Sequence, residues 1–295
     1  MNSFDPLTHS LNSSLPLFDT MAIVGVGLIG GSVGLAAKKR GIVERIIGID
    51  PDAQALALAL ERGVIDFGTQ SLEEGVREAD LILLATPVSV TVSLLPVLLS
   101  LAPPGALITD VGSVKGEIVQ KGKEVFGERF VGGHPMAGSE KSGVQASTED
   151  LFRGKPWAIV RETEFDANAD PYAQRLAEFV AALSATPVFL VSTLHDKTIA
   201  TVSHLPHVLA YAFAGSAQKG LPSETLWRLA GSSFRDFTRI AHAEPELWAG
   251  ILLANRDALL NTLTDFETSL KGLREALEAG DLTTLQEQIE KRRLL

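Results

Sequence analysis

The 295-residue sequence contains no cysteine, and this absence excludes several kinds of site together. The chain cannot form a disulfide, use a thiolate nucleophile, bind zinc through sulfur or carry a cysteine-ligated iron–sulfur cluster. Proteins of a reducing compartment do without disulfides, so the composition agrees with a cytoplasmic location.

Basic residues are also scarce, because 26 lysines and arginines stand against 36 aspartates and glutamates and leave a formal net charge of −10. A surface of this sign repels phosphate backbones and anionic lipid headgroups, so we expect neither nucleic acid nor a membrane as a partner. An anionic small-molecule substrate would have to be bound by a few local arginines.

Membrane-spanning segments are not expected, although two uncharged stretches have the necessary length. Residues 21–37 contain five glycines, and residues 81–109 are divided by four prolines into pieces of strand and helix size. Both stretches therefore indicate buried core. Residues 1–20 have no lysine, arginine or long apolar run, so we expect a flexible tail there and no signal peptide.

The pattern that is present changes near residue 191. Up to Val191, short β-branched runs alternate with helical periodicity, as in crossover units around a parallel sheet. Over 192–295 no strand-like run occurs, and apolar residues recur at helical spacing. We predict an α/β domain over 21–191 followed by an all-helical domain. Strands are expected at 21–26, 45–50, 81–85, 106–109, 130–131, 157–160 and 187–191, and helices at 28–40, 53–62, 88–101, 114–126 and from 171.

A glycine-rich turn follows the first predicted strand and opens the first helix. In such a turn Gly25 allows the tight bend, Gly27 lets a pyrophosphate approach the backbone, and Gly30 permits close packing of the helix. The segment predicts a Rossmann-type dinucleotide-binding domain, the alternative being a turn that only packs helix on sheet. Other expected cofactor-binding residues are Leu28 and Ile29 in the turn and Thr86 and Pro87 after the third predicted strand.

Asp50 closes the second predicted strand. A carboxylate at that position accepts hydrogen bonds from the adenosine ribose hydroxyls and repels the extra phosphate of NADP, so it favours NAD. An acid that stabilises the turn before Pro51 would look the same, and the strictness of the NAD preference stays open.

Two more polar segments follow predicted strands, where ligands sit in doubly wound sheets. Ser113 either reaches the nicotinamide or substrate, or caps a helix starting at Val114 with Lys115 solvated. His134 lies in a glycine-rich segment expected to be a loop, where imidazole can accept a hydroxyl proton as hydride leaves the same carbon. A surface histidine is the alternative.

The helical region contributes two pairs of candidates. His204 and His207 share a helix face, either as metal ligands that lack further partners or as residues that pack at a kinked helix or line a cleft. Asp236 and Arg239 either form an ion pair within a helix, or Asp236 orients the Arg239 guanidinium toward a carboxylate.

In this order the segments resemble those of the prephenate/arogenate dehydrogenases, and the resemblance runs from about residue 21 to the end. The family patterns Asp-x-x-Ser-x-Lys, Gly-Gly-His-Pro-x-Ala-Gly, Ser-His-Leu-Pro-His and Phe-Arg-Asp-x-x-Arg follow a glycine fingerprint. One departure is Ser232-Ser233, where family members commonly have a glycine, which leaves the approach of backbone to ligand there in doubt. The matching segments here are 25–30, 110–115, 132–138, 203–207 and 234–239.

The resemblance implies NAD-dependent oxidative decarboxylation of prephenate or arogenate in tyrosine biosynthesis, with no metal. It implies that His134 contacts the ring hydroxyl, that Ser113 holds this hydroxyl near the nicotinamide, and that Arg239 binds a substrate carboxylate. The helical domain resembles an interleaved dimerisation module, so we expect a homodimer. Further substrate-pocket residues implied by the resemblance are Ser139, Glu140, His204, His207, Asp236 and Trp248.

Two other functions remain open from the sequence. A β-hydroxyacid dehydrogenase usually relies on a lysine of its second domain, for which Lys197 and Lys219 are the early candidates. A non-catalytic, dimeric NAD-sensing module would have no use for His134 together with Arg239. Prephenate and arogenate differ only in a keto or amino group, and the sequence does not distinguish them.

Overall fold

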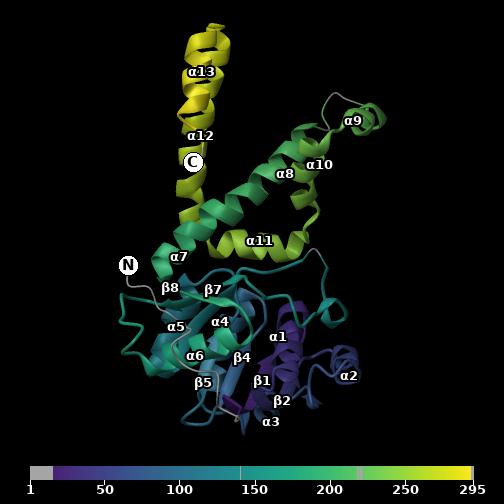
Figure 1. The fold of residues 1–295 in the computed structure, drawn as a ribbon, viewed down its shortest axis with the longest axis vertical. Coiled ribbons are helices and arrows are strands. Elements are labelled where there is room, and N and C mark those ends of the chain that lie inside the picture. The colour runs from purple at the N-terminus through teal and green to yellow at the C-terminus, as the bar shows by residue number, and fades with distance from the viewer. Residues whose placement is uncertain (1–15, 140, 218, 220–221, 294–295) are drawn as a thin grey trace. The chain divides into compact units, whose positions relative to one another are not determined.

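The computed structural model describes residues 16–139, 141–217, 219 and 222–293, which form two compact units (Figure 1). The first unit extends to Asp196 and also includes Ala243–Ala254, and the second contains Lys197–His242 and the residues from Asn255 onward. The last strand ends at Val191, yet compactness groups the following residues up to Asp196 with the sheet. The domain boundary after residue 191 therefore stays a prediction.

The first unit contains an eight-stranded sheet in the order β3-β2-β1-β4-β5-β6-β7-β8 within the described residues. Neighbouring strands are parallel except β6 and β7, which are antiparallel. With the helical second unit, this arrangement confirms the predicted fold class. The strands are β1 (Phe18–Val24), β2 (Val43–Ile49), β3 (Phe67–Thr69), β4 (Leu81–Leu84), β5 (Leu107–Asp110), β6 (Phe130–Pro135), β7 (Pro156–Arg161) and β8 (Thr186–Val191).

Helices cover the sheet and build the second unit. Those of the first unit are α1 (Leu28–Lys39), α2 (Ala53–Glu61), α3 (Leu72–Val76), α4 (Val88–Leu98), α5 (Gly116–Phe126), α6 (Pro171–Ala182) and α11 (Pro245–Ala254), with 3₁₀ turns η1 (Gly127–Arg129) and η2 (Val144–Ala146). Helix α7 (Ser192–Ile199) continues from the first unit into the second. The second unit adds the π-helix η3 (Ala200–His204), α8 (Leu205–Ala217), α9 (Ser223–Leu229), α10 (Ser232–Arg239), η4 (Ile240–His242), α12 (Arg256–Ala279) and α13 (Leu282–Glu290).

The sheet is buried on both faces, which explains the near-continuous apolar runs of its central strands. Successive side chains of a strand point to opposite faces. Met21 and Ile23 of β1 accordingly belong to one hydrophobic cluster, and Ala22 and Val24 belong to the other. All four residues of β4 are fully buried.

The structure corrects three expectations about where elements begin and end. Strand β1 begins at Phe18, which is buried and stacks edge-on against Phe179, so residues 18–20 do not belong to a tail. His134 lies within β6 and not in a loop, because pairing with β7 satisfies the backbone of this glycine-rich segment. Helix α5 begins at Gly116 and not at residue 114.

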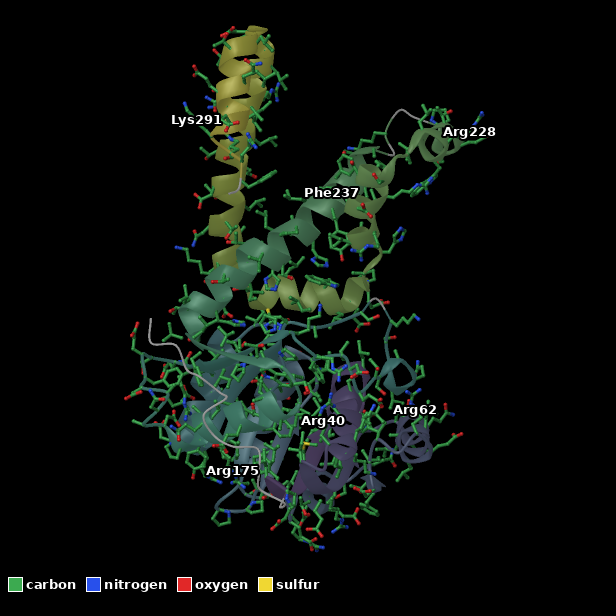
Figure 2. The ribbon with its side chains drawn as sticks, in the orientation of Figure 1. Arg40, Arg62, Arg175, Arg228, Phe237 and Lys291 are labelled. Atoms are coloured by element: carbon green, nitrogen blue, oxygen red, sulfur yellow. The ribbon has the colours of Figure 1, made fainter. Side chains whose placement is uncertain are left out.

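The second unit contains an aromatic cluster formed by α8, α9 and α10. The ring centroid of Phe213 lies 5.6 Å from that of Phe234 and 5.2 Å from that of Phe237, which is labelled in Figure 2. The ring centroid of Trp227 lies 5.7 Å from that of Phe234. In the described part of the chain, no helix combines the length and the apolar character needed to cross a membrane.

Candidate active site

The glycine turn between β1 and α1 has the geometry expected of a dinucleotide site. Gly25 has a φ of +96°, and a Cβ added there would lie 2.5 Å from the Ala85 carbonyl oxygen. A Cβ at Gly30 would lie 2.2 Å from the Gly25 carbonyl oxygen, whereas one at Gly27 would meet nothing within 4 Å. The backbone thus needs glycine at the first and third positions, and open space lies in front of the α1 N-terminus at the second.

Asp50 connects the end of β2 to this turn. Its Oδ2 atom accepts a hydrogen bond of 2.9 Å from the Val26 N–H group, and its Oδ1 atom accepts one of 2.9 Å from the Asp52 N–H group. Each carboxylate oxygen has a second lone pair, so binding to ribose hydroxyls is compatible with these contacts. The role in binding stays a prediction, and the backbone contacts show that Asp50 also stabilises the turn.

The remaining expected cofactor residues surround the same turn. Leu28 and Ile29 are half-buried in the first turn of α1. After β4, the Thr86 hydroxyl lies 2.9 Å from the Thr91 hydroxyl, and exposed Pro87 precedes α4.

Arginines at the C-terminal ends of α1 and α2 bind the segment that follows β6. Arg62 donates hydrogen bonds of 2.9 Å each to the carbonyl oxygens of Gln145 and Ser147, and Arg40 donates one of 3.2 Å to that of Glu149 (Figure 2). Ser139, closer to His134 in sequence, is exposed, and Glu140 lies outside the described residues.

A buried ion pair holds the loop between β5 and α5. The Lys115 ammonium contacts the Asp110 carboxylate, both side chains are 0% exposed, and Lys115 also donates a 2.8 Å hydrogen bond to the Gly133 carbonyl oxygen. Burial lowers the pKa of Lys115, and Asp110 opposes this shift. Of the two alternatives for this segment, the one with a solvated Lys115 is wrong, because the Lys115 ammonium contacts two acceptors inside the protein.

Ser113 lies half-buried in this loop. Because α5 has Lys115 at its N-cap position and no side chain caps it, the capping explanation for Ser113 is wrong. A role near the nicotinamide or substrate stays a prediction.

His134 belongs to a chain of hydrogen bonds that sequence reasoning missed. Its Nδ1 atom lies 2.9 Å from Nε2 of His195, and Nδ1 of His195 lies 2.7 Å from Oδ1 of Asp196. His195 is 1% exposed, whereas His134 is half-buried. The connection joins β6 to α7, and both elements belong to the first unit up to Asp196.

Asp196 is in turn held by the N-terminus of α5. The N–H groups of Lys115 and Gly116 donate hydrogen bonds of 2.8 and 2.7 Å to its two carboxylate oxygens. Burial by itself raises the pKa of Asp196, but hydrogen bonds from His195 and these N–H groups bring it below the ordinary value. Burial lowers the pKa of His195, against the effect of its hydrogen bond to Asp196.

Four of the predicted substrate residues belong to the second unit. Buried His204, in the π-helix, accepts at Nδ1 a 3.0 Å hydrogen bond from the Asn255 amide, while half-buried His207 contacts the Ser203 carbonyl oxygen at 2.9 Å. Burial lowers the pKa of His207.

Asp236 and Arg239 are exposed on α10, and among the described residues no ion pair joins them. Half-buried Trp248 lies on α11 of the first unit.

Comparison with known proteins covers nearly the whole chain. Residues 33–187 match the family model of the prephenate dehydrogenase nucleotide-binding domain, and residues 191–291 match that of the prephenate dehydrogenase dimerization domain. A prephenate dehydrogenase of Bacillus subtilis is 39% identical over 90% of this chain and 72% of its own length.

Solved structures agree with these matches. The crystal structure of prephenate dehydrogenase from A. aeolicus, in complex with hydroxyphenyl propionate and NAD+, superposes with a TM-score of 0.86 and 32% identity over 95% of this chain and 97% of its own. Synechocystis arogenate dehydrogenase gives a TM-score of 0.78 with 28% identity over 92% and 96% of the two chains.

Fold and site define a two-part protein whose sheet-containing unit has the features of a dinucleotide-dependent dehydrogenase. The family matches make the assignment specific. The chain belongs to the prephenate dehydrogenase family.

Proposed function

We propose that this protein oxidises prephenate or arogenate with NAD and releases carbon dioxide, as a step in tyrosine biosynthesis. With prephenate the products are 4-hydroxyphenylpyruvate, carbon dioxide and NADH, and arogenate gives tyrosine. The proposal depends on the position of His134. Strands β1, β4, β5 and β6 are parallel, so His134 near the end of β6 lies at the same sheet edge as the glycine turn after β1.

The residues of this edge fit a nicotinamide dinucleotide. The space at Gly27 admits a pyrophosphate at the N-terminus of α1, and Asp50 beside the turn can bind the adenosine ribose. When bound there, NAD supplies the acceptor for the hydride. The B. subtilis and A. aeolicus relatives are named as prephenate dehydrogenases, and the latter was solved with NAD+.

In this proposal His134 and Ser113 both contact the ring hydroxyl of the substrate. As the C–H electron pair leaves as hydride, His134 accepts the hydroxyl proton and the carbon–oxygen double bond forms. The C–C electron pair left by carbon dioxide completes the aromatic ring, and the proton returns to the phenolic oxygen. Ser113 orients the hydroxyl, and Arg239 binds a substrate carboxylate through its planar guanidinium.

The proposal assigns six further residues to the substrate pocket on the basis of the family resemblance: Ser139, Glu140, His204, His207, Asp236 and Trp248. Membership of an enzyme family argues against the hydroxyacid dehydrogenase and the non-catalytic sensor as alternatives.

We also propose a cytoplasmic homodimer with no nucleic acid partner. Support comes from the match to a dimerization domain and from large apolar side chains exposed on helices of the second unit, such as Leu229 at 82% and Leu282 at 68%. Apolar surface of this kind is typical of an interface.

A single assay tests the activity. NADH formation is followed by absorbance with prephenate and with arogenate, each with NAD and NADP in parallel. We expect turnover of at least one substrate with NAD and much weaker turnover with NADP. A folded protein that reduces NAD with neither substrate would refute the proposal.

A further inference from the structure

The hydrogen-bond chain from Asp196 through His195 to His134 determines which ring nitrogens carry protons. A carboxylate only accepts hydrogen bonds, so His195 must donate from Nδ1 to Asp196. Neutral His195 then has its lone pair on Nε2, the atom that faces His134 Nδ1 at 2.9 Å. His134 must therefore donate from Nδ1, and the lone pair of its neutral ring is on Nε2.

This arrangement selects the tautomer that the reaction needs. A ring nitrogen can take the substrate's hydroxyl proton only if it has a lone pair, and in His134 this nitrogen is Nε2. The opposite tautomer, with the proton on Nε2, would donate to the hydroxyl and could not accept from it. Which tautomer dominates is set by the partner of the other nitrogen, and here that partner is His195.

We propose that His195, held by Asp196, is a positioning residue that fixes His134 in the tautomer able to accept the substrate's hydroxyl proton. The inference rests on the proposed oxidation of the ring hydroxyl. The inference also gives Asp196 a function. Its carboxylate accepts hydrogen bonds from the Lys115 and Gly116 N–H groups at the N-terminus of α5 and from His195, and so fixes the orientation of the His195 ring.

The charges around His195 support a neutral ring. Besides Asp196, the charged groups that act on it are Lys115, which disfavours a second positive charge, and Asp110, which is paired with Lys115. Burial is the main cause that lowers the pKa of His195 below its ordinary value, and Lys115 adds to this effect. A protonated His195 would donate from Nε2 and force His134 into the wrong tautomer, so the neutral state is the functional one.

Two substitutions separate the contacts of His195. In His195→Asn the amide lies near the former Nδ1 and keeps the contact with Asp196, but it loses the acceptor toward His134. In His195→Gln the longer side chain places its carbonyl oxygen near the former Nε2 and keeps that acceptor. We expect His195→Asn to lower kcat by roughly 10–100-fold with little change in KM, and His195→Gln to retain several-fold more activity. His242→Asn, at an exposed position, is the matched control.

A structural role for His195 predicts the reverse order, because Asn preserves the connection between α7 and α5 through Asp196. Equal or higher kcat in His195→Asn than in His195→Gln, with both proteins folded, would overturn the inference. An unchanged pH profile of kcat in both variants would do the same.

A second measurement does not depend on the substrate. Long-range ¹H–¹⁵N correlation spectra of the ligand-free protein report which ring nitrogen of each histidine carries the proton, and loss of one signal set in His134→Asn assigns His134. We expect the Nδ1–H form in the wild type and a shift toward the Nε2–H form in His195→Asn. An Nε2–H wild type overturns the inference even if prephenate is turned over, whereas inactivity with an Nδ1–H spectrum counts against the proposed function alone.

Discussion

His134 is the residue on which the proposed chemistry depends most directly. His134→Asn keeps a hydrogen-bonding group but removes the titratable base. We expect kcat to fall roughly 10²–10⁴-fold while NAD affinity changes little, and the acid limb of the kcat–pH profile to disappear. Steady-state kinetics between pH 5 and 9 test this. Near-wild-type kcat with an intact acid limb would remove His134 from the mechanism.

Lys115 is the residue whose loss should cost the most stability near the site. Lys115→Met leaves Asp110 charged and fully buried without its partner, so we expect the free energy of unfolding to fall by about 3–5 kcal/mol in urea titrations. Lys271→Met removes an exposed pair with Glu275 and should cost less than about 1 kcal/mol. Similar losses in the two variants would show that the buried pair contributes no more than a surface one.

His195 also makes stability depend on pH, and the sign follows from its lowered pKa. Below about pH 6.5 the unfolded chain protonates this histidine while the folded protein does not, so stability falls as the pH drops toward the folded pKa. The Asp196 carboxylate contributes stability that is lost only in a lower range. We expect the unfolding free energy of His195→Gln to decline less than that of the wild type just below pH 6.5, by chemical denaturation at several pH values. Parallel declines would contradict this expectation.

At the scale of elements, two glycines of the turn before α1 have different roles: Gly30 is needed for folding, and Gly27 is expected to be needed for NAD binding. Gly30→Ala places a methyl group against the Gly25 carbonyl oxygen and should cost about 1–3 kcal/mol of stability. The methyl group added in Gly27→Ala meets no neighbour, so the free energy of unfolding should change by less than about 0.5 kcal/mol. Its methyl group occupies the expected pyrophosphate position, and the Kd for NAD should rise at least about tenfold. Calorimetric titration with NAD and thermal unfolding of both variants test this. An unaltered Kd in Gly27→Ala would place the pyrophosphate elsewhere.

Elements with strong local patterns could be predicted from the sequence, and those defined by distant contacts could not. The apolar run of β4 and the glycine turn into α1 depend only on neighbouring residues. Strand β3 has three residues and helix α3 has five, too short for any periodicity to appear. The extension of β6 to Pro135 needs β7 as a partner.

The same distinction applies to the candidate site. His134 stands in a recognisable segment, but its partner His195 is 61 residues away, and Asp196 meets the N–H group of Gly116 across 80 residues. A histidine followed by an aspartate in a helix carries no sequence signal of its own. Only the placement of α7 against β6 and α5 gives these two residues a role.

At the scale of the whole molecule, we expect a dimer. A dimer that buries exposed apolar side chains of the second unit would be stabilised by association, so the midpoint of thermal unfolding should rise with protein concentration. Sedimentation should give about twice the 31.5 kDa of one chain. A mass of one chain at micromolar concentration, with a midpoint independent of dilution, would contradict the dimer.

The path of the chain between the two units limits how relatives can be recombined. The chain passes from one unit to the other after Asp196, after His242 and after Ala254. A chimera that joins this nucleotide-binding segment at Val191 to a relative's helical segment would take His195, Asp196 and α11 from the other parent, although all three belong to the unit with the sheet. The donor's histidine–aspartate pair would then have to form its hydrogen bonds with this protein's His134 and α5. The helical segment of one family member therefore cannot simply replace that of another.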